Sequence, residues 1–291
     1  MSSRPYASTD IALTVIIVNH YSEAVLGDCL AALAAGASAD HREVIIVDNP
    51  AREEAPVFPI PAGLDVRRVK APKRLGFAAA CNLGAETAGG RYLLFLNPDV
   101  RVESSALTRL MAMLVEHLDI GAVVGRLTGP DRAFQPTCRR FPTITRLIAS
   151  RGSMLRRIVR FPEDAYTLPD YPAPTDVDAA AAAMMMLPKN IYNRLGGFDP
   201  SFFMYMEDTD LCYRLREAGY RTVYIPEAEG VHLWGHATRR YRFRRLIWHH
   251  RSVWHYFARR ETSWANRLLL GPALAANCLL SLTAELCTLR P

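Results

Sequence analysis

The sequence lacks the marks of several common protein classes. None of its six cysteines stands in a CxxC pair, which argues against a zinc finger or a disulfide framework and fits a reducing compartment. The segment Met1–Asp10 is polar, so no secretory signal is visible. No G-x-G-x-x-G or G-x-x-x-x-G-K-[ST] string follows an expected strand, which disfavours a dinucleotide-binding Rossmann unit and a P-loop NTPase.

Negative charge is missing from two long stretches. Arg132–Arg160 and Arg239–Arg260 each contain eight arginines and no acid, although the whole chain has 35 basic and 29 acidic residues. The rest of the chain is therefore mildly acidic, and the two stretches are basic patches that attract the phosphates of nucleic acid or of an anionic membrane surface. No recognised nucleic-acid-binding module accompanies them, so we expect no nucleic-acid partner.

Half of the 291 residues are apolar and 22% are charged, so the chain can bury the core of one large α/β domain, or of one domain with a small appendage. In its first half, short apolar runs alternate with segments of helical spacing. The expected strands there are Thr14–Val18, Glu43–Val47, Val66–Val69, Tyr92–Leu96 and Ala122–Gly125, and the expected helices are Ser22–Ala34, Gly76–Ala88 and Ser104–His117. This alternation predicts a doubly wound, mostly parallel sheet, with Ser22 as a helix N-cap.

The second half is less regular. Residues 130–175 are basic and interrupted by proline, which is typical of loops and short helices. We expect strands at Ala179–Leu187 and Thr222–Ile225, helices at Asn190–Leu195 and Glu207–Ala218, and an aromatic loop at Phe198–Tyr205.

Polar residues follow three of the expected strands. They are Val18-Asn19, Asp48-Asn49 and Asn97-Pro98-Asp99. Because ligands bind at the carboxyl ends of the strands in such sheets, we expect all three clusters to face one crevice.

Asp99 is a candidate metal ligand. A carboxylate at the end of a buried strand can hold a hard divalent cation that in turn binds a diphosphate, whereas the alternative is a simple Asn-Pro-Asp turn. His232, in GVHLWGH, is either a second ligand or a structural histidine. Lys73-Arg74, which precedes the helix expected from Gly76, offers either a phosphate site or a solvated cationic loop.

Three acids, Glu207, Asp208 and Asp210, cluster at the start of an expected helix. They either include a general base or only complement the helix dipole. The aromatic loop before them places apolar surface around the carboxylates, which raises a carboxylate pKa towards useful base strength.

The C-terminal segment, residues 239–291, is basic and aromatic and then becomes apolar. Leu268–Ala284 carries no charge over 17 residues, fewer than the ~20 apolar residues that a membrane span needs. We interpret the segment as a helix pair on an anionic membrane surface. A helix packed as ordinary core and a true span are the alternatives.

Six strings, in their order along the chain, resemble the inverting glycosyltransferases of family 2, which have the GT-A fold. Bacterial rhamnosyltransferases that act on polyprenyl-diphosphate-linked sugars are the most similar branch. The strings are TVIIVNH, EVIIVDN, RLGFAAACNLG, GRYLLFLNPDV, GGFDPSFFMYMEDTDLCYRLREAGY and VYIPEAEGVHLWGH. The resemblance runs from about Thr14 to about Thr238. It implies a catalytic domain over residues 1–238, with a donor half over about 12–128 and an acceptor half over about 129–238.

The resemblance also implies roles for the matching residues. Asp208 would be the catalytic base, and Asp99 and His232 would hold Mg²⁺ or Mn²⁺. The donor would be bound by Val18, Asn19, Asp48, Leu75, Gly76, Phe77, Asn82, Asn97 and Asp99, and the acceptor side would be formed by Phe203, Tyr205 and Glu207.

The chain departs from the family pattern at four places. Asn97 stands where the metal motif DxD has its first acid, and His20 replaces an aromatic residue. The usual DNAS string continues as Pro50-Ala51, and alanines at Ala179–Ala183 replace the usual V-x-G-A.

We therefore expect an inverting transferase that moves L-rhamnose, or another deoxyhexose or hexose, from a dTDP- or UDP-linked donor. Its acceptor would be a hydroxyl of a glycan or lipid-linked saccharide in cell-surface polysaccharide synthesis, and the enzyme would be cytoplasmic and peripheral on the inner face of the cell membrane. Two alternatives stay open. A sugar-phosphate nucleotidyltransferase would need a Gly-rich loop where this chain has NHYSEA, and a membrane-associated subunit without activity is suggested by Asn97.

Overall fold

The computed structural model describes residues 12–36, 42–49, 57–143, 146, 166–233, 241–260 and 264–287. Several sequence features lie outside these ranges. They are Met1–Asp10, Pro50-Ala51, most of the second half of the basic stretch Arg132–Arg160, and the end of the GVHLWGH string.

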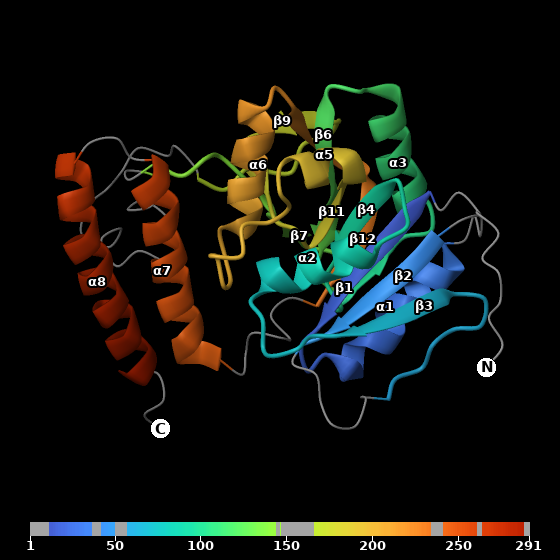
Figure 1. Ribbon diagram of the computed structural model, residues 1–291, viewed down its shortest axis with the longest axis horizontal. Helices are drawn as coiled ribbons and strands as arrows, with labels where there is room; N and C mark the ends of the chain where they lie inside the picture. Colours follow the sequence, from blue (N-terminus) through green and yellow to red (C-terminus); the bar gives the residue numbers. More distant parts are fainter. Residues whose placement is uncertain are drawn as a thin grey trace.

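A ten-stranded mixed sheet forms the centre of the molecule (Figure 1). Its first half is parallel and follows the order β3 (Asp65–Lys70), β2 (Arg42–Asp48), β1 (Leu13–Asn19) and β4 (Tyr92–Leu96). Both β1 and β2 are buried on their two faces, which is why they are continuous apolar runs in the sequence.

The second half of the sheet contains β11 (Met184–Pro188), β6 (Ile120–Thr128), β12 (Arg221–His232) and β5 (Val100–Val102). The strand β11 runs antiparallel to both β4 and β6 and so joins the two halves. The short strands β7 (Phe134–Gln135) and β9 (Thr175–Val177) pair with β6 and β12. Separately, β8 (Cys138–Arg139) pairs with β10 (Ala179–Ala180).

Helices cover the two faces of the sheet. On one face, α2 (Phe77–Thr87) and α6 (Glu207–Glu217) pack in the same core cluster as Ile16 and Ile45. On the other face, α1 (Glu23–Ala35) and α3 (Ala106–Glu116) pack with Val15 and Ile17. A short helix, α5 (Lys189–Arg194), follows β11.

Two helices, α7 (Arg242–Arg260) and α8 (Trp264–Cys287), stand side by side at the end of the molecule opposite β3 (Figure 1). The buried face of α7, with Val253 and Tyr256, packs against Phe202 of the predicted aromatic loop and against Met206, which precedes α6. Neither α8 nor any other helix within the described ranges combines the length and apolarity that crossing a membrane requires.

Most predicted strands and helices are confirmed, with shifts of a few residues at their ends. The prediction of one strand over Ala179–Leu187 is wrong, because the chain leaves β8 after Ala180 and joins β4 and β6 only from Met184. Residues 181–183 between them line a cleft. The last strand is also longer than predicted: β12 resumes after an irregularity between Ile225 and Glu229 and continues to His232.

Ser22 directly precedes α1 but makes no side-chain capping bond. Ser22 is thus the N-cap residue of α1, as predicted, and its backbone N–H donates to Asn19 Oδ1 at 3.1 Å. Where loops and short helices were expected in residues 130–175, the described part contains the short strands β7, β8 and β9.

Candidate functional site

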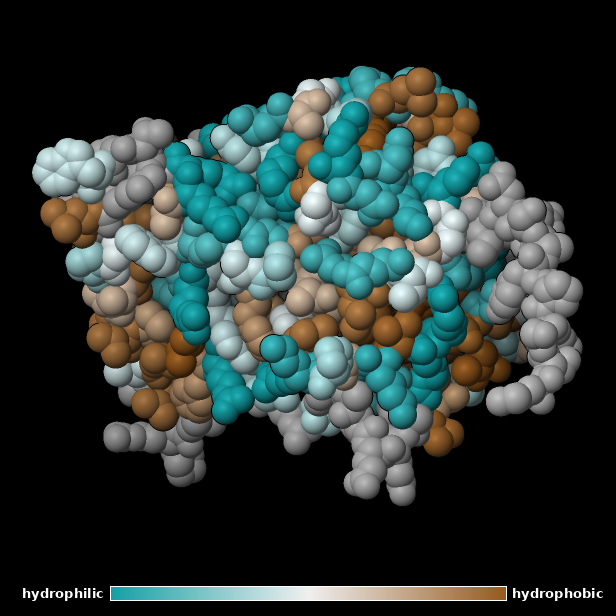
Figure 2. Space-filling view, in the orientation of Figure 1, coloured by the Kyte–Doolittle hydropathy of each residue, from teal (hydrophilic) through white to brown (hydrophobic). Residues whose placement is uncertain are grey.

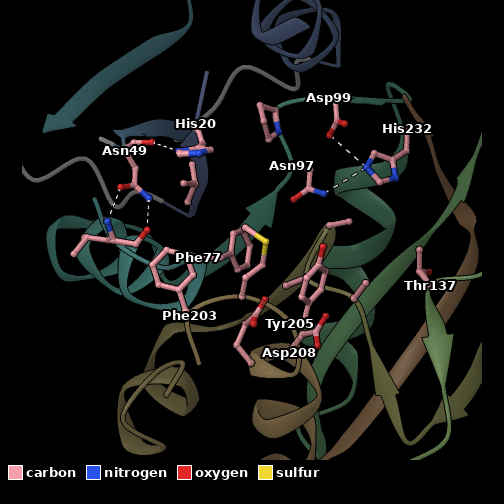
Figure 3. A pocket seen from close by; sticks show the side chains of 18 of the residues that line it. His20, Asn49, Phe77, Asn97, Asp99, Thr137, Phe203, Tyr205, Asp208 and His232 are labelled. Atoms are coloured by element: carbon pink, nitrogen blue, oxygen red, sulfur yellow. Dashed lines mark hydrogen bonds and ion pairs between the residues drawn. The ribbon is translucent and has the colours of Figure 1, made fainter. Parts of the chain in front are cut away.

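A cleft of about 320 Å³ opens beside the carboxyl ends of β1 and β4 (Figure 3). Residues from both halves of the chain line it. Ten of the predicted site residues are among them: Val18, Leu75, Phe77, Asn97, Asp99, Phe203, Tyr205, Glu207, Asp208 and His232.

Hydrogen bonds between loops hold together the wall of the cleft that follows β1, β2 and β3. Asn49, after β2, donates from Nδ2 to Leu75 O at 2.9 Å and accepts from Leu75 N at 2.8 Å. His20, after β1, bonds through Nδ1 to Asn49 O (Figure 3). These contacts fix the three loops after β1, β2 and β3 against one another, as expected where parallel strands end at one edge.

Four predicted donor-binding residues do not line the cleft but support its walls. Asp48 is buried, pairs with Arg68 at 2.7 Å and accepts a hydrogen bond from Asn19 at 3.0 Å. Asn82 holds the backbone N–H and carbonyl of Phe198 at 3.0 and 2.7 Å.

Gly76 immediately precedes α2 and lies against the backbone of Phe203. Any β-carbon at this position would clash with the Phe203 carbonyl, and the adjacent Phe77 N–H donates to that carbonyl at 2.8 Å. Gly76 therefore allows two segments of the same chain, the start of α2 and the backbone at Phe203, to lie in direct contact.

Asp99 and His232 meet at the far side of the cleft. His232 Nε2 lies 3.3 Å from Asp99 Oδ1 and 3.4 Å from Asn97 Nδ2. Both side chains are buried, at 6% and 7% exposure. Gln135 holds the histidine twice, because its Nε2 donates to His232 O at 2.9 Å and its Oε1 lies 3.0 Å from His232 Nδ1.

These bonds settle the orientation of the imidazole. The Gln135 amide donates to the backbone, so its oxygen faces Nδ1 and places the ring proton there. Nε2 then faces the Asp99 carboxylate. In the neutral imidazole Nε2 is an acceptor, and two acceptors at this distance suit a cation between them. Within the described ranges, however, no group of three or more histidine, cysteine or acidic side chains is arranged to hold a metal ion.

Glu207 and Asp208 begin α6 on the facing side of the cleft (Figure 3). The two residues before them, Tyr205 and Met206, both have left-handed backbone, with φ of 70° and 69°. Such strain in non-glycine residues costs about 1–3 kcal/mol each and concentrates at functional sites. Here the turn brings the first residues of α6 to the cleft.

The two carboxyls have different surroundings. Asp208 Oδ1 accepts from Thr209 N at 2.7 Å, and its Oδ2 lies 3.6 Å from Arg139 Nη2. Glu207 Oε2 has no hydrogen-bond partner in the described structure. Burial and the neighbouring Asp208 raise the pKa of Glu207 to about 8.

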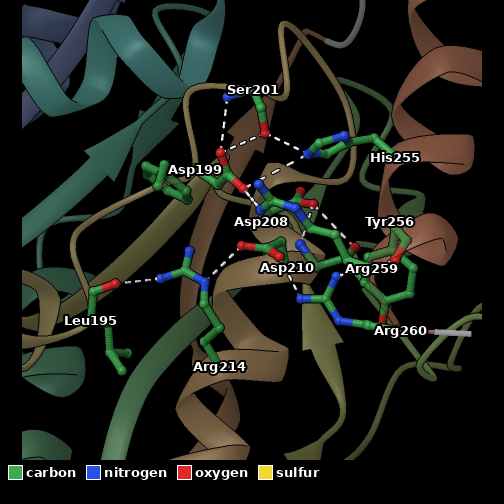
Figure 4. Close-up of polar contacts among 12 residues, drawn as sticks. Leu195, Asp199, Ser201, Asp208, Asp210, Arg214, His255, Tyr256, Arg259 and Arg260 are labelled. Atoms are coloured by element: carbon green, nitrogen blue, oxygen red, sulfur yellow. Dashed lines mark hydrogen bonds and ion pairs between the residues drawn. The ribbon is translucent and has the colours of Figure 1, made fainter. Parts of the chain in front are cut away.

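The aromatic loop before α6 is held from outside the sheet by α7 (Figure 4). Ser252 Oγ donates to Met204 O at 2.9 Å, and the ring of Trp248 lies 4.8 Å from that of Phe203. Figure 4 shows the adjoining polar contacts, in which Arg259 pairs with Asp199, Arg260 with Asp210, and His255 with Ser201 and Asp199.

Comparison with known proteins places this geometry in a family. The glycosyl transferase family 2 model matches residues 14–175, and the model of glycosyl transferase family group 2 matches residues 171–288. The chain belongs to glycosyl transferase family 2. It is a glycosyltransferase, as predicted, and neither alternative function is favoured.

Two relatives of this glycosyltransferase are named as rhamnosyltransferases. It is 28% identical over 239 residues to the N-acetylglucosaminyl-diphospho-decaprenol L-rhamnosyltransferase of Mycobacterium tuberculosis, covering 76% of each chain. It is also 28% identical over 184 residues to rhamnosyltransferase WbbL of Escherichia coli, covering 58% of this chain and 62% of WbbL.

Solved structures share the fold at low sequence identity. The mannosyltransferase PcManGT from Pyrobaculum calidifontis, in complex with GDP-Man and Mn²⁺, aligns with a TM-score of 0.56 and 16% identity over 98% of this chain and 77% of that chain. GalNAc-T7 with UDP, GalNAc and Mn²⁺ aligns with a TM-score of 0.56 and 15% identity, over 78% of this chain and 44% of that one. The glycosyltransferase therefore has the predicted GT-A fold.

Sequence reasoning missed three polar residues in the cleft of this glycosyltransferase. They are Gln135, Thr137 and Arg139, from β7, β8 and the connection between them. Arg139 was visible only as one member of a basic patch. Its alternation with Gln135 and Thr137, which is typical of one strand face, is the signal that could have separated it from the other arginines.

Proposed function

We propose that this glycosyltransferase inverts the anomeric carbon of a deoxyhexose, with L-rhamnose as the first candidate, when moving it from a dTDP- or UDP-linked donor to a lipid-linked saccharide. The names of the two rhamnosyltransferase relatives support this sugar. The observation that carries the proposal is that Asp99 and Asp208, from opposite halves of the chain, line one cleft.

Donor binding is assigned to the wall formed by Val18, Asn49, Leu75 and Phe77. Asn19, Asp48, Gly76 and Asn82 support that wall from behind, and Asn97 donates towards His232 at the bottom. Their contribution to donor binding is thus mostly through the shape of the pocket.

Asp99 and His232 fit a divalent cation. Mg²⁺ and Mn²⁺ accept one or two protein ligands when phosphate oxygens and water complete the shell, so two side chains suffice if a diphosphate donor is bound. When bound, the cation would supply positive charge to the leaving diphosphate. We therefore assign Asp99 and His232 as its ligands, with Gln135 fixing the orientation of the histidine.

Asp208 is assigned as the general base. It would take the proton from an acceptor hydroxyl, whose oxygen forms the new bond to the anomeric carbon as the bond to the nucleotide diphosphate breaks on the opposite face. Its carboxylate is oriented by Thr209 N and Arg139. Phe203 and Tyr205 form the acceptor-side wall.

A membrane surface is the proposed location of the lipid-linked acceptor. The outer face of α8 exposes large apolar side chains and is one of the hydrophobic areas in Figure 2. These side chains are Trp264, Leu268, Leu279, Leu280 and Leu286, at 50–77% exposure. Arginines exposed on α7, such as Arg244 and Arg251, add positive charge. We assign this pair of helices to the inner face of the cell membrane.

The decisive experiment is transfer to N-acetylglucosaminyl-diphospho-polyprenol, with dTDP-L-rhamnose compared with UDP- and GDP-sugars in the presence of Mg²⁺ or Mn²⁺. We expect a disaccharide product from the dTDP donor, with the anomeric configuration opposite to that of the donor by NMR. A product that retains the donor configuration, or transfer from no nucleotide sugar, would contradict the proposal.

A further inference from the structure

Glu207 has an unusual position for a charged residue. It lines the cleft beside Asp208, yet only 6% of the residue is exposed. Its Oε2 is completely buried and has no hydrogen-bond partner within the described structure. A buried carboxyl oxygen without a partner lowers stability, so it requires an explanation beyond helix capping.

The groups that face Glu207 decide its charge. Asp208 follows it on α6, Cys81 faces it from α2, Tyr205 precedes it and Arg139 reaches it from β8. Burial and then Asp208 raise the pKa of Glu207 to about 8, and Arg139 opposes this only in part.

Neither of the other two neighbours supplies a positive charge. Burial raises the pKa of the Cys81 thiol and, with Glu207 adding to it, keeps that thiol neutral. Burial likewise raises the pKa of Tyr205. A pKa of about 8 keeps Glu207 protonated at neutral pH, and a protonated carboxyl carries one O–H donor that an ionised carboxylate lacks.

We propose that Glu207 binds the acceptor as a hydrogen-bond donor, through its protonated carboxyl, and so positions the hydroxyl that Asp208 deprotonates. This inference rests on the proposed function. The ligand atom is an oxygen of the acceptor saccharide, from a hydroxyl or an acetamido carbonyl. Two adjacent carboxyls thereby take opposite parts, one giving a hydrogen bond and the other accepting a proton.

Substitutions of Glu207 distinguish a protonated hydrogen-bond donor from an ionised carboxylate. Glu207→Ala removes the donor, so the acceptor KM should rise about tenfold while the donor KM does not change. Glu207→Gln has nearly the same shape and keeps an N–H donor, so it should restore most of the loss at pH 7. The exposed Glu217, at the other end of α6, provides the matched control Glu217→Gln.

The pH profile gives the second readout. In the wild type, kcat/KM for the acceptor should fall as the pH rises above about 8, because Glu207 loses its proton. In Glu207→Gln this fall should disappear, whereas it should persist in Glu217→Gln. Thermal unfolding measured on each variant separates loss of fold from loss of binding.

Two results would overturn the inference. One is a Glu207→Gln variant as impaired as Glu207→Ala, which would require an ionised carboxylate. The other is an unchanged acceptor KM in Glu207→Ala, which would make the residue purely structural. Both are distinct from failure of the proposed function, in which the wild type itself would transfer no sugar to the acceptor.

Discussion

The two sides of the cleft are built in different ways. With the roles proposed above, the donor side consists of loops that directly follow parallel strands, and its contacts, such as Asn49 with Leu75, join neighbouring loops. The acceptor side combines short strands, a strained turn at Tyr205 and a helix, α7, from beyond the sheet. The donor side therefore follows from the sheet itself, whereas the acceptor side depends on packing between distant segments.

The largest effect is expected on the acceptor side at Asp208. Asp208→Asn removes the proposed base, so turnover should fall by about 10²–10⁴ while binding of the nucleotide donor persists. Single-turnover transfer and donor calorimetry would measure the two effects. Near-normal turnover would contradict the assignment of Asp208 as the base. Loss of donor binding would show that a change on the acceptor side also alters the donor side.

Tyr256 tests the dependence of the acceptor side on α7. It is 2% exposed and packs in the cluster with Phe202 and Met206, so Tyr256→Ala should cost about 3–5 kcal/mol of packing. We expect Tyr256→Ala to reduce sugar transfer to the acceptor more strongly than it reduces binding of the nucleotide donor. The exposed Ile247 on the same helix gives the control Ile247→Ala, which should behave as wild type in both assays.

Gln135 tests whether the cation site depends on its neighbours. Gln135→Leu removes both bonds to His232, and such changes behind a metal ligand typically reduce affinity 10–100-fold. Mn²⁺ titration followed by electron paramagnetic resonance, with the nucleotide diphosphate present, would measure this directly. Unchanged affinity would mean that His232 does not bind the cation.

The smallest effect is expected at the outer face of α8. Replacing both Leu279 and Leu280 by Glu adds negative charge to an exposed apolar face, so binding to anionic liposomes should weaken by about tenfold. Transfer to a short, water-soluble acceptor should be unaffected. Equal binding of wild type and variant in a flotation assay would assign this face to something other than a membrane.

The same contrast separates what the sequence predicts from what it does not. Runs such as TVIIV specify buried strands because every residue faces a helix layer, so β1, β2 and β4 were predictable, together with the residues that follow them. Asp208 and His232 were candidates from their own surroundings and received their roles from the resemblance, but no local pattern places them opposite each other.

The remaining features depend on partners far along the chain. The strands β5, β7 and β8 have two or three residues each and are defined by pairing rather than by composition. The predicted strand Ala179–Leu187 divides into β10 and β11 because the segment joins two sheets, which its apolar periodicity does not indicate. The packing of α7 on the loop before α6 likewise joins residues about fifty positions apart.

The attachment of Met204 to Ser252 has a consequence for how such enzymes diversify. The wall that we assign to the acceptor is shaped by a helix that contributes no strand to the sheet. Mutations accumulating on that helix can therefore remodel the selection of acceptors while the pocket for the activated sugar is inherited intact. Exchanging the helix among related enzymes is accordingly a rational route to new linkages.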